Sequence, residues 1–278
     1  MAWPAAATAG AVLTIASFDA AVVFVALAMS AFMALATAVE RLTGNSGWID
    51  VVWTFGLGLT GILGALLPFG AGPMSRRLFV ATLALAWALR LGRHIARRTA
   101  GITEDHRYAK LKRNWGSDAS RQLARLLQMQ ALVSIPLGLG IILAAHSPAP
   151  SLGWRDFAGL ALFGAGLAGG AIADGQLRAF ARSGAGGVCD HGLWRWSRHP
   201  NYFFECLLWC SYALIAPAAD YPWGWLAVLA PACITLLLTR ISGIPPLEEH
   251  MLAKHGEAYR AYQHRTSALI LLPPKGAT

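Results

Sequence analysis

Residues 18–39 read FDAAVVFVALAMSAFMALATAV. This apolar run is long enough to cross a membrane as a helix, which needs about 20 mostly apolar residues. The whole chain has the same character, because 56% of its 278 residues are hydrophobic, only 13% are charged and the mean hydropathy is +0.48. A soluble globular protein carries about 25% charged residues. The composition therefore excludes disordered, collagen-like and coiled-coil chains and predicts an all-α integral membrane protein.

Further apolar stretches follow the first one along the chain. A soluble all-helical protein would need polar faces on these stretches, and long parts of them have none. We do not expect the N-terminal residues to form a cleavable signal peptide, because they lack a basic start and Asp19 interrupts them. We expect one membrane domain over residues 1–278, whose C-terminal half, about 150–273, holds most of a cofactor site. The seven predicted membrane helices cover 18–39, 50–70, 78–97, 130–147, 155–180, 202–219 and 222–241.

The loop charges predict the orientation. The formal net charge is +9, and the Lys and Arg residues gather in residues 91–129, residues 178–200 and the C-terminal tail. Basic loops face the cytoplasm, so the N-terminus is expected outside, the C-terminus and a cap of loops with a C-terminal helix inside, and a bacterial inner membrane around them. Arg76 and Arg77 fall on the predicted outer side and are the exception. Because the loops account for the basic charge, we expect no nucleic-acid partner.

The cysteines indicate neither a disulfide framework nor a metal site. Three of the four lie in apolar stretches, and no His and Cys cluster completes a zinc site around them. We therefore predict free thiols at Cys189, Cys206, Cys210 and Cys233 and no bound metal.

Ionisable groups at the ends of membrane helices mark candidate functional sites, because burying a charge in a membrane is costly. At the end of the 155–180 helix, Asp174, Arg178 and Arg182 are spaced four residues apart and share one helix face. The functional interpretation is that an arginine binds a phosphate while Asp174 binds a hydroxyl or an amide. The alternative is an internal ion pair with a snorkelling arginine.

Residues 192–205 read GLWRWSRHPNYFFE and combine aromatic and polar side chains before the sixth predicted helix. Pro200 suits the first turn of a helix, so Asn201 and Glu205 lie one turn apart on one face. Arg198 and His199 lie at the N-terminus of that helix, where anions are favoured. A buried glutamate needs a partner, so this segment predicts a binding site.

Three other segments carry candidate groups. The tail, residues 248–265, is either part of a binding site or a solvated amphipathic helix. The basic loop at residues 104–112 either contacts a phosphate or is an ordinary solvated loop. Residues 45–53 place Asp50 at the start of the second helix, with Trp87 and Arg90 of the third helix at a similar depth; tryptophan anchoring at the membrane surface is the alternative there.

The 192–205 segment, with residues 174–177 before it and the Glu-Glu and Gly-Glu-x-Tyr-x-x-Tyr tail after it, resembles the bacterial DUF1295 group, which is similar to the steroid 5-alpha-reductase family. The resemblance covers Asn45 to Pro273. It implies seven membrane helices, an NADPH cofactor and reduction of a carbon–carbon double bond conjugated to a ketone in a lipophilic, steroid-like substrate.

The resemblance also implies site residues. Asn201 and Glu205 match the pair that holds the nicotinamide carboxamide, and Asp174 and Arg178 match the pair that meets the adenosine. Asp50 aligns with the catalytic glutamate, and as a buried, protonated acid it would stabilise the charge that forms on the ketone oxygen. Trp87 falls where the family has its catalytic tyrosine. The full set expected to bind the cofactor is Arg90, Arg107, Tyr108, Lys112, Asp174, Arg178, Arg182, Arg198, His199, Asn201, Tyr202, Glu205, Glu248, Tyr259 and Arg265.

A second family shares the Arg-His-Pro-x-Tyr signature and the Glu-Glu tail. This isoprenylcysteine carboxyl methyltransferase group binds S-adenosylmethionine, and we keep it as the alternative function. Charge favours NADPH, whose phosphates need several Arg or Lys side chains. No GxGxxG follows a strand, because no strand is expected, and no Walker A, HExxH or GxSxG motif is present. Helices and loops would therefore hold the nucleotide. A non-enzymatic membrane scaffold or lipid-binding protein is the third possibility. The expected partners are a lipophilic substrate and membrane lipid, and we expect a monomer.

Overall fold

The computed structural model describes residues 14–276. Within these residues the chain is helical and contains no strand, apart from an isolated bridge between Ala218 and Tyr221. The prediction of an all-α protein is therefore confirmed. The α-helices are α1 (Ile15–Thr43), α2 (Gly47–Leu66), α3 (Met74–Thr99), α4 (His106–Trp115), α5 (Ala119–Val133), α6 (Ile135–Ala145), α7 (Trp154–Arg182), α8 (Pro200–Ile215), α9 (Leu229–Leu236), α10 (Ile244–His255) and α11 (Glu257–Arg265).

Six segments of the described chain are long and apolar enough to cross a membrane. The remaining one of the seven predicted helices, 202–219, coincides with α8, which has 16 residues and is shorter than the other candidates. The spans support a multi-pass integral membrane protein, while its orientation stays a prediction. The six candidate spans are Ala16–Thr43, Gly47–Leu66, Met74–Thr99, His106–Ala145, Trp154–Arg182 and Pro222–His255.

The chain divides into two compact units. The first unit contains Met1–Phe157 and Tyr212–Ala230, and the second contains Ala158–Ser211 and Pro231–Thr278. The prediction of one membrane domain stays a prediction, because α7, α8 and α9 each contribute residues to both units.

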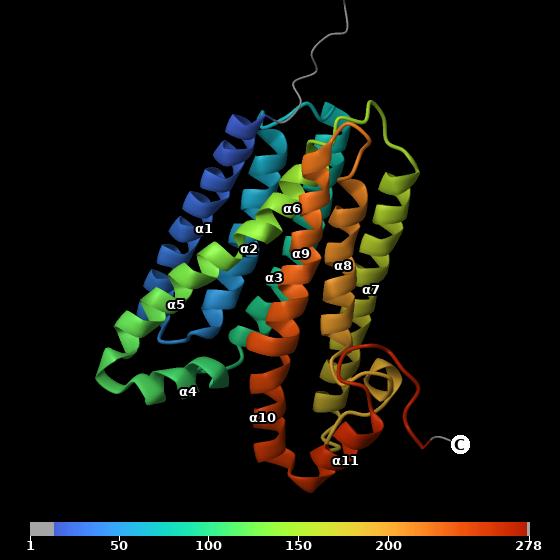
Figure 1. Ribbon diagram of the computed structural model, residues 1–278. Helices are drawn as coiled ribbons and strands as arrows, with labels where there is room; N and C mark the ends of the chain where they lie inside the picture. Colours follow the sequence, from blue (N-terminus) through green and yellow to red (C-terminus); the bar gives the residue numbers. More distant parts are fainter. Residues whose placement is uncertain (1–13, 277–278) are drawn as a thin grey trace, which may run out of the picture. The chain divides into compact units, whose positions relative to one another are not determined.

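Small residues let the helices of the first unit pack closely. In Figure 1, α1, α2 and α3 run side by side, and a Cβ atom added to Gly58 of α2 would lie 2.4 Å from the Cβ of Ala88 in α3. A Cβ atom at Gly56 would lie 2.5 Å from the ring of Phe32 in α1. Small residues at such crossings are typical of membrane helices, whose association depends on close packing.

Two arginines near the start of α3 have partners that the sequence could not reveal. Arg76 is 2% exposed and forms an ion pair with Asp156, with Nη1 and Oδ1 2.5 Å apart. Arg77 Nε donates to the carbonyl oxygen of Ala65 at 2.8 Å, and its Nη2 donates to Leu66 and Leu67. Arg76 is thus neutralised by an acid, and Arg77 satisfies carbonyl groups that the end of α2 leaves open.

In the second unit, α7 packs against α8 through glycines. A Cβ atom at Gly166 would lie 2.8 Å from the carbonyl oxygen of Phe204 and 2.9 Å from the Cα of Leu208. The chain then turns between α10 and α11 at Gly256, whose φ of 55° suits a residue without a side chain. Figure 1 shows α10 and α11 meeting at this turn. The close packing brings the polar N-terminal turn of α8 next to the last turns of α7.

Candidate functional site

In the first unit, an acid, an arginine and a tyrosine meet at the starts of α2 and α4. Arg107 Nη2 donates to Asp50 Oδ2 at 2.5 Å, and the Tyr108 hydroxyl donates to Asp50 Oδ1 at 3.2 Å. Tyr108 is 4% exposed. The resemblance implied a protonated acid at Asp50; in the structure both of its carboxylate oxygens accept hydrogen bonds, one from Arg107 and one from Tyr108.

Asp105 fixes the position of this arginine. It caps α4 by accepting from Arg107 N at 3.0 Å, and it also accepts from Arg107 Nε at 3.0 Å. Burial alone would raise the pKa of Asp105, but the hydrogen bonds and charge of Arg107, together with Arg98, lower it below its ordinary value. Asp105 therefore stays ionised and holds Arg107 toward Asp50.

Lys112 has carboxylate partners of its own in the same unit. Its Nζ lies 2.5 Å from Glu40 Oε1 and 2.8 Å from Glu104 Oε2. Glu104 also accepts from the backbone N–H of Ser46 at 2.9 Å, just before α2. Lys112, predicted to bind the cofactor, here connects α1, α4 and the loop before it.

Trp87 packs in an aromatic pair. It is 1% exposed and meets Trp53 edge to face, with ring centroids 6.3 Å apart at an angle of 81°. Trp53 Nε1 donates to Ser134 Oγ at 2.8 Å. Arg90 follows one turn after Trp87 on α3 and is half-buried. An indole ring gives the Trp87 position apolar shape, whereas a phenol would also offer a proton.

The second unit joins the two motifs on which the sequence analysis relied. Asn201 Nδ2, in the first turn of α8, donates to Asp174 Oδ1 of α7 at 3.3 Å. Gln176 Oε1 of α7 accepts from the backbone N–H of Leu193 at 2.9 Å, which fixes the 192–205 segment against the same helix. Arg178 and Arg182 follow on α7 and are exposed. The structure thus brings Asp174 and Asn201 together, with the two arginines further along α7.

Glu205 lies one turn after Asn201 on α8. Its Oε1 accepts from Trp209 Nε1 at 2.9 Å, and its side chain is half-buried. A carboxylate can accept about four hydrogen bonds, so the bond from Trp209 orients the group and is compatible with a further donor.

Glu248 of α10 holds three side chains of the second unit. Its Oε1 accepts from Arg198 Nε at 2.7 Å and lies 3.0 Å from His199 Nε2, and its Oε2 accepts from Gln263 Nε2 at 2.7 Å. We call these four residues the Glu248 cluster. Burial lowers the pKa of His199 below its ordinary value, although Glu248 acts in the opposite direction. Tyr202 stacks on His199, with ring centroids 5.4 Å apart.

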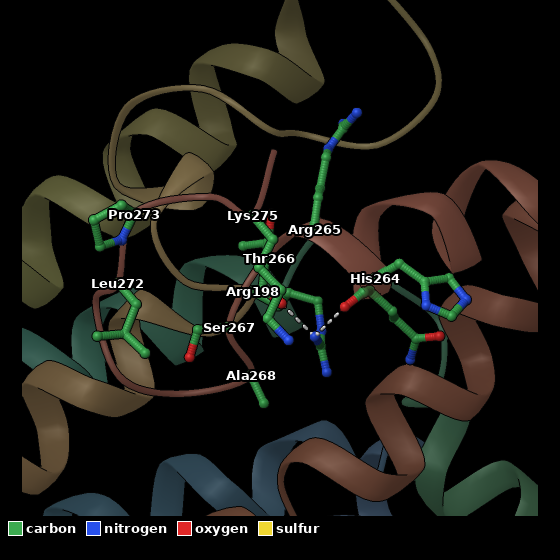
Figure 2. A pocket seen from close by; sticks show the side chains of 10 residues that line it. Arg198, His264, Arg265, Thr266, Ser267, Ala268, Leu272, Pro273 and Lys275 are labelled. Carbon is green, nitrogen blue, oxygen red and sulfur yellow. Dashed lines mark hydrogen bonds between the residues drawn. The ribbon is translucent and has the colours of Figure 1, made fainter. Parts of the chain in front are cut away.

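The tail is bonded to the segment before α8. Figure 2 shows Arg198 bonded to backbone carbonyls, and its Nη1 donates to Gln263 at 3.1 Å and to Thr266 at 2.5 Å. The Arg198 backbone N–H donates to Ser267 at 2.8 Å. Arg198, predicted to contact the cofactor, therefore holds the protein's own tail.

Tyr259 and Tyr262 of the tail are buried, and Tyr262 bonds to the segment before α8. The Tyr262 hydroxyl donates to the carbonyl groups of Trp194 and Ser197. Burial raises the pKa of both Tyr259 and Tyr262, so their hydroxyls keep their protons. A site role was predicted for Tyr259 but not for Tyr262, although the Tyr-x-x-Tyr spacing of the tail was a signal for both.

A pocket of about 280 Å³ opens beside this tail (Figure 2). Arg265 contributes to it, and its Nη2 also donates to Asp190 Oδ2 at 2.5 Å. The residues around the pocket are Arg198, Gln263, His264, Arg265, Thr266, Ser267, Ala268, Leu272, Pro273 and Lys275.

The predicted site residues thus fall into both units. Asp50, Trp87, Arg90, Arg107, Tyr108 and Lys112 belong to the first, and the other predicted cofactor residues belong to the second. The four cysteines are free thiols, as predicted. Across residues 14–276, the His, Cys, Asp and Glu side chains form no group of three or more that could hold a metal ion.

Comparisons with known proteins give one match. A family described as "Protein of unknown function (DUF1295)" matches residues 36–266. No curated protein and no solved structure matches the chain.

Proposed function

Because the chain belongs to the DUF1295 family, whose description names no activity, we propose that it is a membrane-embedded, NADPH-dependent reductase of a carbon–carbon double bond conjugated to a ketone in a lipophilic substrate. The observation that carries the proposal is the hydrogen bond from Asn201 to Asp174. It unites the two motifs that the resemblance to steroid 5-alpha-reductases assigns to the cofactor.

The second unit has donors and acceptors that fit a nicotinamide nucleotide. A carboxamide offers an N–H₂ donor and a carbonyl acceptor, and a carboxylate with an amide complements both. Glu205 and Asn201 lie one turn apart on α8 and would hold that group. Arg178 and Arg182 are exposed after Asp174 on α7, and guanidinium groups suit phosphates. Bound NADPH would supply a hydride for the β-carbon of the substrate.

The first unit has a group that can supply the proton. Asp50 already accepts a hydrogen bond from Arg107. The Tyr108 hydroxyl carries a proton and donates to the other oxygen of Asp50. We therefore assign proton donation to Tyr108 and positioning of that hydroxyl to Asp50. A substrate ketone oxygen bound at Tyr108 would accept this proton, while Asp50 orients the hydroxyl.

Nucleotide binding tests the proposal directly. Detergent-solubilised protein should bind NADPH, measured by calorimetry, and should not bind S-adenosylmethionine. Loss of a charge-assisted contact costs about 1.5–3 kcal/mol, so Arg178→Gln or Arg182→Gln should weaken NADPH binding by about tenfold or more. Arg121→Gln changes an exposed arginine of α5 and should leave affinity unchanged. Tight S-adenosylmethionine binding without NADPH binding would refute the reductase proposal and support the methyltransferase alternative.

A separate measurement tests the nicotinamide contact. Glu205→Ala should weaken NADPH binding, because the carboxamide loses its acceptor. Glu205→Gln is the matched variant, since it keeps the size and an acceptor oxygen for Trp209. Affinity unchanged in both variants would remove Glu205 from the site.

Turnover tests the proton donor. With a panel of lipophilic enones, loss of dihydronicotinamide absorbance reports the rate. Tyr108→Phe should lower turnover about 10²–10³-fold, as removal of one donor to a developing oxyanion does, and should leave NADPH affinity unchanged. Asp50→Asn keeps an acceptor for Tyr108 but loses the charge, and we expect at least a roughly tenfold loss. Wild-type turnover in Tyr108→Phe would exclude this assignment.

A further inference from the structure

The last residues of the second unit form a surface with both apolar and basic side chains. Trp196, Ile270 and Leu272 are 44%, 56% and 49% exposed. The backbone N–H of Leu272 donates to the carbonyl of Trp196 at 3.0 Å, which brings the two segments together. We call Trp196, Ile270, Leu272, Arg265 and Lys275 the tail surface.

The basic members of the tail surface lie beside the apolar ones. The Lys275 backbone N–H donates to the carbonyl of Arg265 at 2.8 Å, so these residues are neighbours although the sequence separates them. Both border the pocket that Leu272 and Pro273 also line, and Figure 2 shows these residues around it. The pocket lining, as described, includes cationic and apolar side chains and no acidic one.

The tail surface lies at the end of membrane-type helices. Trp196 precedes α8 by one turn, and the neighbouring Leu193 is bonded to Gln176, in the last turns of the candidate span α7. Tryptophan is enriched where a helix leaves the hydrocarbon layer. Exposed aliphatic side chains suit the boundary of the acyl chains, and nearby cations suit anionic headgroups.

We propose that the tail surface binds an anionic phospholipid, with Arg265 and Lys275 at its phosphate and Trp196, Ile270 and Leu272 against the start of its acyl chains. A guanidinium has five N–H donors, so the bond from Arg265 to Asp190 is compatible with a second anion. This site lies outside the proposed reaction, and it assigns Arg265 to lipid where the family resemblance assigned it to the cofactor.

Native mass spectrometry of the full-length protein in detergent tests the proposal, with phosphatidylglycerol as the probe and phosphatidylcholine as the neutral reference. A cation near an anionic membrane surface contributes a free energy equivalent to about a fivefold change in binding. Arg265→Gln and Lys275→Gln should therefore each weaken phosphatidylglycerol retention about fivefold. The tail should stay folded in both variants, because backbone bonds hold it. Lys254→Gln and Arg260→Gln, at exposed positions of α10 and α11, should leave retention unchanged.

Two competitors distinguish the sources of the phosphate. Inorganic phosphate should not displace phosphatidylglycerol at equal concentration, because it lacks the acyl chains. NADPH should not displace it either, and NADPH affinity should be equal in Lys275→Gln and the wild type. Displacement by either competitor, or equal lipid retention in the double variant and the controls, would overturn the proposal. Because NADPH binding is measured separately, a failure here leaves the reductase proposal standing.

Discussion

Removal of the Glu248 carboxylate should destabilise the second unit more than any surface change. Glu248→Ala deletes the acceptor for Arg198, His199 and Gln263. Arg198 would keep its bonds to the tail carbonyls, but its charge would lose its carboxylate. His199 would lose the partner of its Nε2, and its Nδ1 already has no hydrogen-bond partner within the described structure.

The burial of the cluster sets the magnitude. The side chains of Arg198, Glu248 and His199 are 11%, 15% and 2% exposed. Breaking a fully buried ion pair by removing one partner costs about 3–5 kcal/mol, and partial exposure puts this cluster at the lower end, about 3 kcal/mol. A loss of 1 kcal/mol shifts Tm by roughly 2–4 °C for about 150–250 residues. We therefore expect Tm to fall by about 6–12 °C.

Thermal unfolding in detergent, followed by tryptophan fluorescence, measures this shift. Glu248→Gln keeps an acceptor oxygen and should lose less than the alanine variant. Glu257→Ala is the control, because that side chain is 89% exposed and lies 4.0 Å from Arg260; an exposed pair contributes about 0–1 kcal/mol. If Glu248→Ala has the same Tm as the Glu257→Ala control, the interpretation of the cluster is refuted.

Three further changes follow from the structure. Stability should fall as pH drops below about 6.5 toward the lowered folded-state pKa of His199, because the unfolded state binds the proton more readily; Tm measured against pH should show this slope, and His199→Gln should reduce it. Gly166→Val should lower Tm, since overpacking costs about 1–3 kcal/mol and its Cβ would meet the backbone of α8, while Gly164→Val, with no atom within 4 Å, should not; equal melting would contradict the packing. Arg76→Gln should lower the free energy of unfolding by about 3–5 kcal/mol, because it leaves Asp156 buried without its cation; urea unfolding of this variant and the wild type would measure the loss, and equal midpoints would contradict it.

Hydropathy predicted the helices well because it depends only on local composition. Six of the seven predicted spans correspond to long apolar segments. The remaining one, α8, is a helix of 16 residues that starts at Pro200. Its first turn contains the polar Asn201, which donates to Asp174.

Partners could not be predicted, because they come from distant parts of the chain. Asp50 was expected to act as an acid, and its partner Arg107, which bonds to it, lies 57 residues away in sequence. Arg198 was expected to contact the cofactor on charge alone, yet its guanidinium binds carbonyls 65 and 68 residues further along. A count of charges identifies cations, and only the fold shows which anions or carbonyls they already hold.

The bonds between the segment before α8 and the tail affect the order of assembly during synthesis. The Ser197 hydroxyl donates to the carbonyl of Leu269, 72 residues later, at 2.7 Å. A ribosome releases a chain from its N-terminus onward, and contacts of high sequence separation form late. The segment before α8 can therefore make this bond only after residue 269 has been synthesised. Translation that stops before residue 269 would leave the second unit without it.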